Sequence, residues 1–554
     1  MSQRMQGQPM IILGEDSQRM KDQDAQAHNI SAARAVAESV KSTLGPKGMD
    51  KMLVDNLGDV TVTNDGVTIL TEMDIDNPTA SMIVEVAETQ EDEAGDGTTT
   101  AVATAGELLK NAEDLLDQDI HPTSIIRGFN LASEKAREEL DEIAVDVDPE
   151  DEEVLKNVAG TSMTGKGAEV NKEVLTDLVV RAIQQVTVEA DDGSYVPDLE
   201  FLNIHKQSGR PAAESELLEG GLVDKDPVHA KMPKNVEDAK VLLFDTDIEV
   251  DDTEANTQLS VDDPDQLQEF IEQEEERLKE IVENIKATGA NVVVTQKGID
   301  DMAEHYLARE GILAIRRAKK SDIEFLSEVL ETRIISDVDS VSEDDIGHGS
   351  VTRSDDDERF EFEGPGHGAT LLLRGSTNHV VDELERGIND ALDVVASTVA
   401  DGRVLAGGGA VEVELAGRVR DYADSVDGRE QLAVEAFADS LELVPRVLAE
   451  NAGLDSIDTL VDLRAAHEAG DEHAGLNVYT GDVVDTFEAG VVEPAHAKQQ
   501  AISSATEAAN LVMKIDDIIA AGDLSTAGGD EEGGAPGGGM GGMGGMGGGM
   551  GGMM

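Results

Sequence analysis

The chain has 554 residues, more than a single hydrophobic core normally serves, so roughly two to four domains are expected. Its 117 acidic residues outnumber 43 basic residues and give a net charge of -74, so nucleic acids and anionic membranes would repel it. Cysteine is absent, which excludes disulfide bonds, thiolate nucleophiles and cysteine-based metal sites.

Helical patterns dominate the N-terminal third. Apolar residues recur at three- and four-residue steps from Ala25 to Leu44, and Gly45-Pro46 ends this predicted helix. The segment 61–70 predicts a strand, a turn at Asn64-Asp65-Gly66 and further apolar residues. More helices are predicted over 79–93, 98–118, 122–143 and 150–187.

Short apolar runs alternate with helical patterns in the middle of the chain. Strands are predicted at 240–244, 291–296, 311–316 and 369–374, and helices at 299–309 and 321–331. This alternation is typical of an α/β domain, which is expected at about 221–366. An acidic insertion, 245–263, leads into a predicted helix at 264–287. Taken alone, these residues would form an ordinary surface loop and a solvated helix.

Long helices rich in alanine and valine return after residue 376, and the chain ends in a glycine- and methionine-rich segment, 524–554. Such a segment loses too much chain entropy on ordering to fold, so a flexible, disordered tail is expected. The first residues contain too short an apolar run for a signal peptide, and no run reaches the ~20 residues of a membrane helix. A soluble, cytoplasmic protein is therefore expected.

The clearest candidate for ligand binding is Gly95-Asp96-Gly97-Thr98-Thr99, directly before a predicted helix. Its glycines let the backbone approach a ligand, its threonines would cap the helix, and a helix N-terminus attracts anions such as phosphate. The Asp96 carboxylate would repel phosphate unless Mg²⁺ lay between them, so Asp96 is predicted to bind Mg²⁺. The alternative is an Asp-Gly turn with a threonine cap and no ligand.

Three other glycine-containing segments are weaker candidates. Gly45-Pro46 and the Gly-Gly-Gly run at 407–409 each lie beside a predicted helix, where the backbone could approach a ligand or simply turn. Asn64-Asp65-Gly66 is equally well explained as the turn of a β-hairpin.

The segment from Gly160 to Gly167 nearly matches the P-loop pattern GxxxxGK[ST]. Gly167 replaces the hydroxyl residue that would bind Mg²⁺, and the segment follows a helical pattern rather than a strand. We therefore reject a P-loop, although Lys166 stays a candidate contact for a phosphate group.

The order of the motifs along the chain is more specific than any one of them. Segments that resemble the signatures of chaperonins, in family order, are LGPKGMDKML (44–53), TVTNDGVTIL (61–70), AGDGTTTAVA (94–103), GTSMTGK (160–166), ERGINDALDVV (385–395), AGGGAVEVEL (406–415), GLNVYTGDVVD (475–485) and VVEP (491–494). The chain most resembles the group II, archaeal thermosome type. Its acidic stretch and helix at about 245–287 match the helical protrusion that group II subunits use as a built-in lid.

The acidic residues are unusually numerous even for this family. They are spread through periodic, apolar-containing segments, which does not fit a disordered acidic chain. At about 1 M salt, charges are screened within ~3 Å, so such a surface suits a very salty cytosol. We therefore expect the chain to come from a halophilic archaeon.

The resemblance implies a multi-domain fold of the α+β and α/β classes. A mostly helical equatorial ATPase domain would comprise 1–148 and 402–523, and a small intermediate domain 149–220 and 367–401. An α/β apical domain, 221–366, would bind substrate proteins and carry the protrusion.

The resemblance also implies which residues bind ATP and Mg²⁺. The expected phosphate contacts are Gly45, Pro46, Gly97, Thr98 and Thr99, with Asp96 at Mg²⁺. The expected nucleoside contacts are Gly408, Asn477 and Glu493, with Glu493 at the ribose hydroxyls.

Two carboxylates are implied to be catalytic, Asp65 and Asp390, which would converge on the attacking water. Phosphoryl transfer needs mainly positioning and charge neutralisation, so two carboxylates, a metal ion and backbone amides suffice. Asp390 would arrive from the intermediate domain, so hydrolysis would follow domain closure, with Lys166 sensing the γ-phosphate.

The implied function is ATP-dependent folding of unfolded client proteins in a double ring of identical or paralogous subunits. One alternative is a ring scaffold or holdase without ATPase activity, which the presence of Asp65, Asp96 and Asp390 argues against. The other is an unrelated P-loop ATPase, which Gly167 argues against.

Replacing Lys166 with alanine separates the chaperonin from the P-loop interpretation. In a chaperonin, we expect ATP affinity to stay within about twofold while lid closure is impaired; in a P-loop ATPase, affinity should fall by about tenfold or more. Calorimetric ATP titration measures the affinity, and resistance to protease measures closure.

Overall fold

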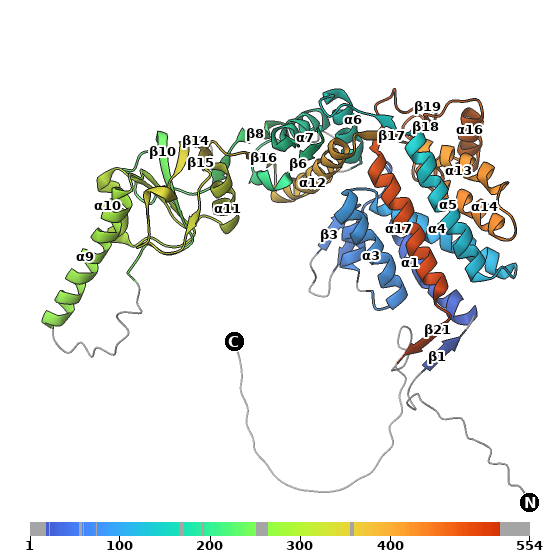
Figure 1. Ribbon diagram of the computed structural model, residues 1–554, viewed down its shortest axis with the longest axis horizontal. Helices are drawn as coiled ribbons and strands as arrows, with labels where there is room; N and C mark the ends of the chain where they lie inside the picture. The colour runs from blue at the N-terminus through green and yellow to red at the C-terminus, as the bar shows by residue number, and fades with distance from the viewer. Residues whose placement is uncertain are drawn as a thin grey trace, which may run out of the picture. The chain divides into compact units, whose positions relative to one another are not determined.

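The computed structural model describes residues 18–21, 23–54, 58, 60–73, 75–165, 171–190, 193–250, 264–354 and 359–520. By their contacts these residues form two units, Asn29–Lys514 and the described residues of the two chain ends. In the second unit, strand β1 (Gln18–Lys21) pairs antiparallel with β21 (Asp517–Ala520) (Figure 1). The predicted tail, 524–554, and Lys166 lie outside the described residues.

A first hydrophobic core joins helices from both ends of the chain (Figure 1). Its helices are α1 (Gln23–Lys41), α2 (Gly66–Glu72), α3 (Pro78–Ala94), α4 (Thr98–Asp117), α5 (Pro122–Ile143), α13 (Ala410–Ala423), α14 (Glu430–Leu441) and α17 (Ala495–Lys514). Helices α15 (Leu443–Asn451) and α16 (Ser456–Glu468) pack beside α13. The helix predictions at 79–93, 98–118 and 122–143 are confirmed, and α1 ends three residues before the predicted Leu44.

Small sheets border these helices. Strands β20 (Val492–Pro494), β17 (Arg403–Ala406) and β4 (Val145–Asp146) form one sheet in that order. Three further pairs are β2 (Lys51–Val54) with β3 (Val60–Thr63), β5 (Thr187–Glu189) with β6 (Tyr195–Pro197), and β18 (Ala474–Leu476) with β19 (Val483–Asp485).

A second core lies around a three-stranded sheet of order β7 (Leu202–Ser208), β16 (Ala369–Gly375) and β8 (Glu216–Glu219). Three helices contribute to it: α6 (Glu152–Met163), α7 (Lys172–Val186) and α12 (Asn378–Asp401). The single helical stretch predicted over 150–187 is therefore two helices, and the strand predicted at 369–374 is confirmed as β16.

A third core surrounds a seven-stranded sheet in which β10 (Asn235–Phe244) is central. The path is β12 (Leu313–Ile315), β11 (Val292–Thr295), β10, β14 (Gly347–Ser354), β15 (Arg359–Glu363) and β9 (Gly221–Val223), with β13 (Ile334–Ile335) beside β10. Strands β10, β11 and β12 are parallel, and β11 and β12 are wholly buried, as strands covered on both faces are. The predicted alternation of strands and helices is confirmed here.

Helices α9 (Pro264–Ala287), α10 (Asp301–Glu310) and α11 (Lys320–Val329) belong to the third core. The predicted helix at 264–287 is confirmed, and its apolar side chains Leu278, Ile281, Val282 and Ile285 are buried. Residues 251–263 of the acidic insertion lie outside the described part of the chain. Short 3₁₀ turns complete the fold at Leu199–Phe201, Ala212–Glu214 and Glu343–Asp345.

The β-hairpin alternative for Asn64-Asp65-Gly66 is wrong, because a helix follows the turn. Asp65 is the N-cap of α2: its carboxylate Oδ2 accepts hydrogen bonds from the Thr68 amide at 2.8 Å and the Thr68 hydroxyl at 2.6 Å. Capping of this kind stabilises a helix start by about 1 kcal/mol, enough to decide between two local structures. Among the helices of the described residues, none is long and apolar enough to cross a membrane.

The first core makes a stability prediction at the ring pair Phe129 and Phe437, which meet edge to face at 6.0 Å between centroids. Both side chains are fully buried, so Phe437→Ala should lower the free energy of unfolding by about 3–5 kcal/mol. Urea unfolding in molar KCl, followed by circular dichroism, measures this loss. The control is Leu432→Ala on the same helix, whose side chain is exposed; equal losses in the two variants would contradict the packing described.

Candidate functional site

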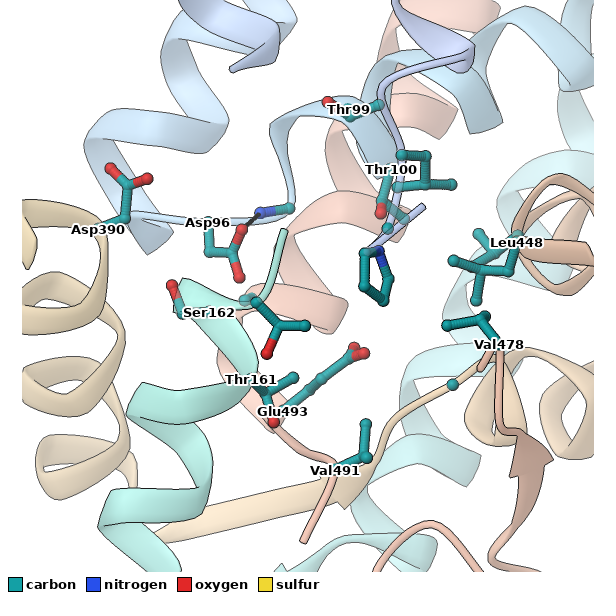
Figure 2. A pocket seen from close by; sticks show the side chains of 18 of the residues that line it. Asp96, Thr99, Thr100, Thr161, Ser162, Asp390, Leu448, Val478, Val491 and Glu493 are labelled. Carbon is teal, nitrogen blue, oxygen red and sulfur yellow. Dashed lines mark hydrogen bonds between the residues drawn. The ribbon is translucent and has the colours of Figure 1, made fainter. Parts of the chain in front are cut away.

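One cavity of about 560 Å³ lies within the larger unit, where loops between helices of the first core meet α6 and α12 (Figure 2). It is lined by every predicted site residue that the structure describes: Gly45, Pro46, Asp65, Asp96, Gly97, Thr98, Thr99, Asp390, Gly408, Asn477 and Glu493. The fold of the described residues thus brings together segments that are separated by hundreds of positions in the chain.

The loop Gly95-Asp96-Gly97 between α3 and α4 forms one wall. Both glycines have left-handed backbones, with φ of 64° and 84°, a conformation that strongly favours glycine. The Gly97 amide donates to Asp96 Oδ1 at 2.7 Å, which fixes the carboxylate inside the cavity (Figure 2).

The start of α4 differs from the prediction that threonine caps it. The N-cap residue is Gly97, and no described side chain caps the helix. The Thr98 hydroxyl instead donates to Glu91 Oε2 at 2.8 Å. Because the first amides of a helix lack partners within it, this N-terminus is suited to hold an anionic group such as a phosphate.

Two more loops line the cavity. Gly45 has a φ of +77°, and a Cβ atom there would lie 2.2 Å from Leu448 Cδ2, so the backbone passes against that side chain. The Asn64 side-chain amide donates to the Gly165 carbonyl at 2.9 Å, which ties the turn before Asp65 to the end of α6.

Helix α12 brings Asp390 to the side of the cavity where Asp96 lies (Figure 2). One turn further along, Asp393 packs against Gly95, since a Cβ atom on Gly95 would lie 2.3 Å from the Asp393 Cβ. Only glycine permits this approach between α12 and the Asp96 loop.

Glu91 and Asp393 are acidic residues at the site that the sequence interpretation missed. Burial, together with the charges of Asp390, Asp65 and Asp96, raises the pKa of Glu91 to about 7, although its hydrogen bond from Thr98 opposes this. Burial and then the charge of Asp390 raise the pKa of Asp393 to about 6. Glu91 lies in an acidic run that resembles a solvated helix face, but it follows the buried Ala87 by four residues, a spacing that could have indicated it.

Lys172, at the start of α7, is a second kind of residue that was missed. It lines the cavity, and its ammonium donates to the Thr164 hydroxyl at 2.7 Å. Thr161 and Ser162 of α6 also line the cavity, so hydroxyl groups and a cation share it with the acidic residues. Thr161 and Ser162 lie in the segment 160–166 recognised in the sequence, whereas no local pattern marked Lys172, which reaches the cavity because α7 packs against α6.

The other end of the cavity is more apolar. Leu448, Val478 and Val491 line it, and the Glu493 carboxylate reaches in from β20 (Figure 2). The Asn477 side-chain oxygen accepts from the amides of the next turn, including that of Tyr479 at 3.0 Å, so Asn477 also shapes the loop. An apolar slot with a carboxylate beside it can take a flat ring that is joined to a group carrying hydroxyls.

The residues fit a magnesium–phosphate ligand better than a bare metal ion. Across the described ranges, no group of three or more histidine, aspartate or glutamate side chains could hold a metal by itself. Mg²⁺ commonly takes one or two carboxylates and completes its shell with water and phosphate oxygens. Asp96, beside an uncapped helix N-terminus, matches that arrangement.

Comparison with known proteins gives matches over nearly the whole chain. Residues 36–523 match the family model described as "TCP-1/cpn60 chaperonin family". The chain is 72% identical over 543 residues to thermosome subunit 2 of Haloferax volcanii, covering 97% of this chain and 98% of that one. It is 70% identical over 532 residues to thermosome subunit beta of Halobacterium salinarum, covering 95% and 96%.

A solved structure shares the fold. It is an open-state monomer of a group II chaperonin from Methanococcoides burtonii, with a TM-score of 0.61 and 43% sequence identity. The match covers 76% of this chain and all of that one.

The raised pKa of Glu91 predicts how stability depends on pH. Between its ordinary 4.5 and about 7, the folded protein keeps a proton that the unfolded chain has released, so this carboxyl lowers stability as pH rises through that window. Glu91→Gln keeps an acceptor for Thr98 but cannot ionise. From about pH 5 to about pH 8, the variant should gain roughly 1–3 kcal/mol over the wild type, allowing for solvent screening.

Thermal unfolding without nucleotide, measured across this pH range, checks the expected gain. Glu88→Gln on the same helix is the matched control, because Glu88 is exposed. An advantage of Glu91→Gln that does not change with pH would contradict the prediction.

Proposed function

Because the chain belongs to the TCP-1/cpn60 chaperonin family, we propose that the cavity around Asp96 is the site where it binds and hydrolyses ATP. The chain is a group II chaperonin subunit of the thermosome type, similar to subunits from halophilic archaea, and its function is ATP-dependent protein folding. The observation that supports the site most strongly is that all the described residues predicted from separate motifs line one cavity.

The phosphates of ATP would lie at the start of α4. The backbone amides of Thr98 and Thr99 would donate hydrogen bonds to phosphate oxygens, and Gly97 would let the phosphates approach the backbone closely. Gly45 and Pro46 would close the opposite wall. Asp96 would hold Mg²⁺, which when bound neutralises phosphate charge. The apolar end with Gly408, Asn477 and Glu493 would hold the nucleoside.

Two carboxylates would act on the attacking water. The orientation of Asp65 is set by its hydrogen bonds with Thr68. Asp390 would face it from α12 and accept a proton from the water as the water oxygen bonds to the γ-phosphorus. The bond from that phosphorus to the bridging oxygen breaks, and ADP and phosphate are released. Glu91, close to both, would make this region still more negative unless a proton or a cation compensates.

Helix α12 would couple hydrolysis to movement. Its residues Val381 and Leu384 belong to the second core, whereas Asp390 and Asp393 lie at the ATP site. We assign the three cores to the equatorial, intermediate and apical domains with the boundaries predicted from the sequence. A shift of the intermediate domain would then move Asp390 relative to Asp96, so hydrolysis would depend on closure.

Client folding would take place in a ring with other subunits. The two relatives are each named as one of several subunits, which supports a ring of copies of this chain with paralogous subunits. Unfolded proteins would bind the apical domain, and the protrusion that includes α9 would act as the lid. Lys166 keeps its proposed role as the sensor of the γ-phosphate.

Replacing Asp390 with alanine tests the catalytic assignment. ATP hydrolysis in molar KCl with Mg²⁺ should fall by at least about a hundredfold, because a positioned proton acceptor is lost, while ATP binding and assembly persist. Turnover and particle size are measured in parallel. The control is Asp382→Ala, which removes an acidic residue of the same helix that is paired with Lys206 away from the cavity and should leave turnover near the wild-type rate.

Two outcomes would contradict the proposal. If the wild type assembles without hydrolysing ATP, the ring is a scaffold or holdase and the assignment of an ATPase site is wrong. If Asp390→Ala hydrolyses ATP as fast as Asp382→Ala, Asp390 has no catalytic role.

A further inference from the structure

A nearly buried cation lies between two carboxylates at the apolar end of the cavity. Lys498 of α17 places its ammonium 2.6 Å from Glu412 Oε1 and 2.6 Å from Glu493 Oε2. Its side chain is 13% exposed, and those of Glu412 and Glu493 are 7% and 25% exposed. The three residues come from α17, α13 and β20, so only the folded chain brings them together.

The charges in this triad depend on one another. Burial by itself lowers the pKa of Lys498, but the charges of Glu412 and Glu493 outweigh it and raise this pKa, so Lys498 stays protonated. Burial raises the pKa of Glu493, and the adjacent Lys498 opposes that rise. Without the cation, two carboxylates would be left close together and mostly out of water, which is strongly unfavourable.

Glu493 is also held by the backbone around it. Residue 493 is paired with Leu405 in the antiparallel strands β20 and β17. A Cβ atom on Gly407 would lie 2.8 Å from Glu493 Oε1, so the chain passes directly against the second carboxylate oxygen. One oxygen is therefore bonded to Lys498 and the other is confined by Gly407, while the carboxylate reaches into the cavity (Figure 2).

We propose that Lys498 is a positioning residue that sets the preference of this site for nucleotides with ribose hydroxyls, by holding the Glu493 carboxylate in place. This inference rests on the proposed role of Glu493 at the ribose. A fixed carboxylate accepts hydrogen bonds from vicinal hydroxyl groups, and a ligand that lacks one hydroxyl leaves an oxygen unpaired. Glu412 holds Lys498 from the other side.

The test compares the affinity of the full-length, assembled protein for ATP and for 2′-deoxy-ATP and 3′-deoxy-ATP. Calorimetric titration in molar KCl with Mg²⁺ gives the ratio of dissociation constants for each variant. In the wild type, loss of a hydrogen bond to a charged group should weaken a deoxy-nucleotide by about tenfold or more. In Lys498→Met, the dissociation constants for ATP and for the deoxy-nucleotide should differ by no more than about twofold. The same small ratio is expected for Glu493→Gln.

Glu412→Gln is the matched control. Its side-chain oxygen still accepts a hydrogen bond from Lys498, so the preference should stay within about twofold of the wild type. Both Lys498→Met and Glu412→Gln should lower the unfolding temperature. If the triad had only a structural role, the nucleotide preference would not change in Lys498→Met alone. If Lys498→Met fails to assemble, Lys498→Gln replaces it and should lose at least about threefold of the preference.

Two results overturn the proposal in different ways. If Glu493→Gln loses the preference and the Lys498 variants keep it, the role of Lys498 is wrong and that of Glu493 stands. If the wild type and Glu493→Gln discriminate equally, the nucleoside assignment of Glu493 in the proposed function is wrong, and the inference falls with it.

Discussion

The site depends on mutual repulsion among carboxylates that the fold holds around one cavity. Asp65, Asp96 and Asp390 all act on Glu91, and together with burial they raise its pKa to about 7. Like charges in a partly desolvated space disfavour ionisation until a cation or a proton arrives. A Mg²⁺–ATP complex would bring the cation, and the start of α4 would hold the phosphates. Binding of this ligand would therefore relieve the repulsion among the carboxylates, which would add to its affinity.

This arrangement also requires close contact between segments that belong to different cores. Asp393 of α12 packs directly on Gly95, and the same helix is anchored in the second core through Val381. Because packed contacts of this kind change in discrete steps rather than gradually, a shift of α12 would alter the position of Asp390 as a unit. The proposed dependence of hydrolysis on domain position rests on this connection.

The opposite end of the cavity manages charge in another way. There, Lys498 offsets part of the negative charge of Glu412 and Glu493 from inside the protein. The two ends of the cavity would therefore interact differently with a nucleotide. The acidic end would need a cation for binding, whereas the end with Lys498 offers the held Glu493 carboxylate as a hydrogen-bond acceptor. The large negative charge of the whole chain is distinct from these local charges, and it concerns how the protein interacts with solvent and salt.

The sequence by itself determined the family, the helices with clear periodicity such as α3, α4, α5 and α9, and the motif residues that line the cavity. These features are recorded locally, in spacing and in short glycine-rich segments. It missed the helix after Asp65, because an N-cap and a hairpin turn share the same residues and the Thr68 hydrogen bonds decide between them. Glu91, Asp393, Lys172 and Lys498 emerged only from the tertiary structure. Their importance comes from burial and from charges contributed by segments far away in the chain. Apart from the spacing of Glu91 from the buried Ala87, no local pattern indicates either quantity.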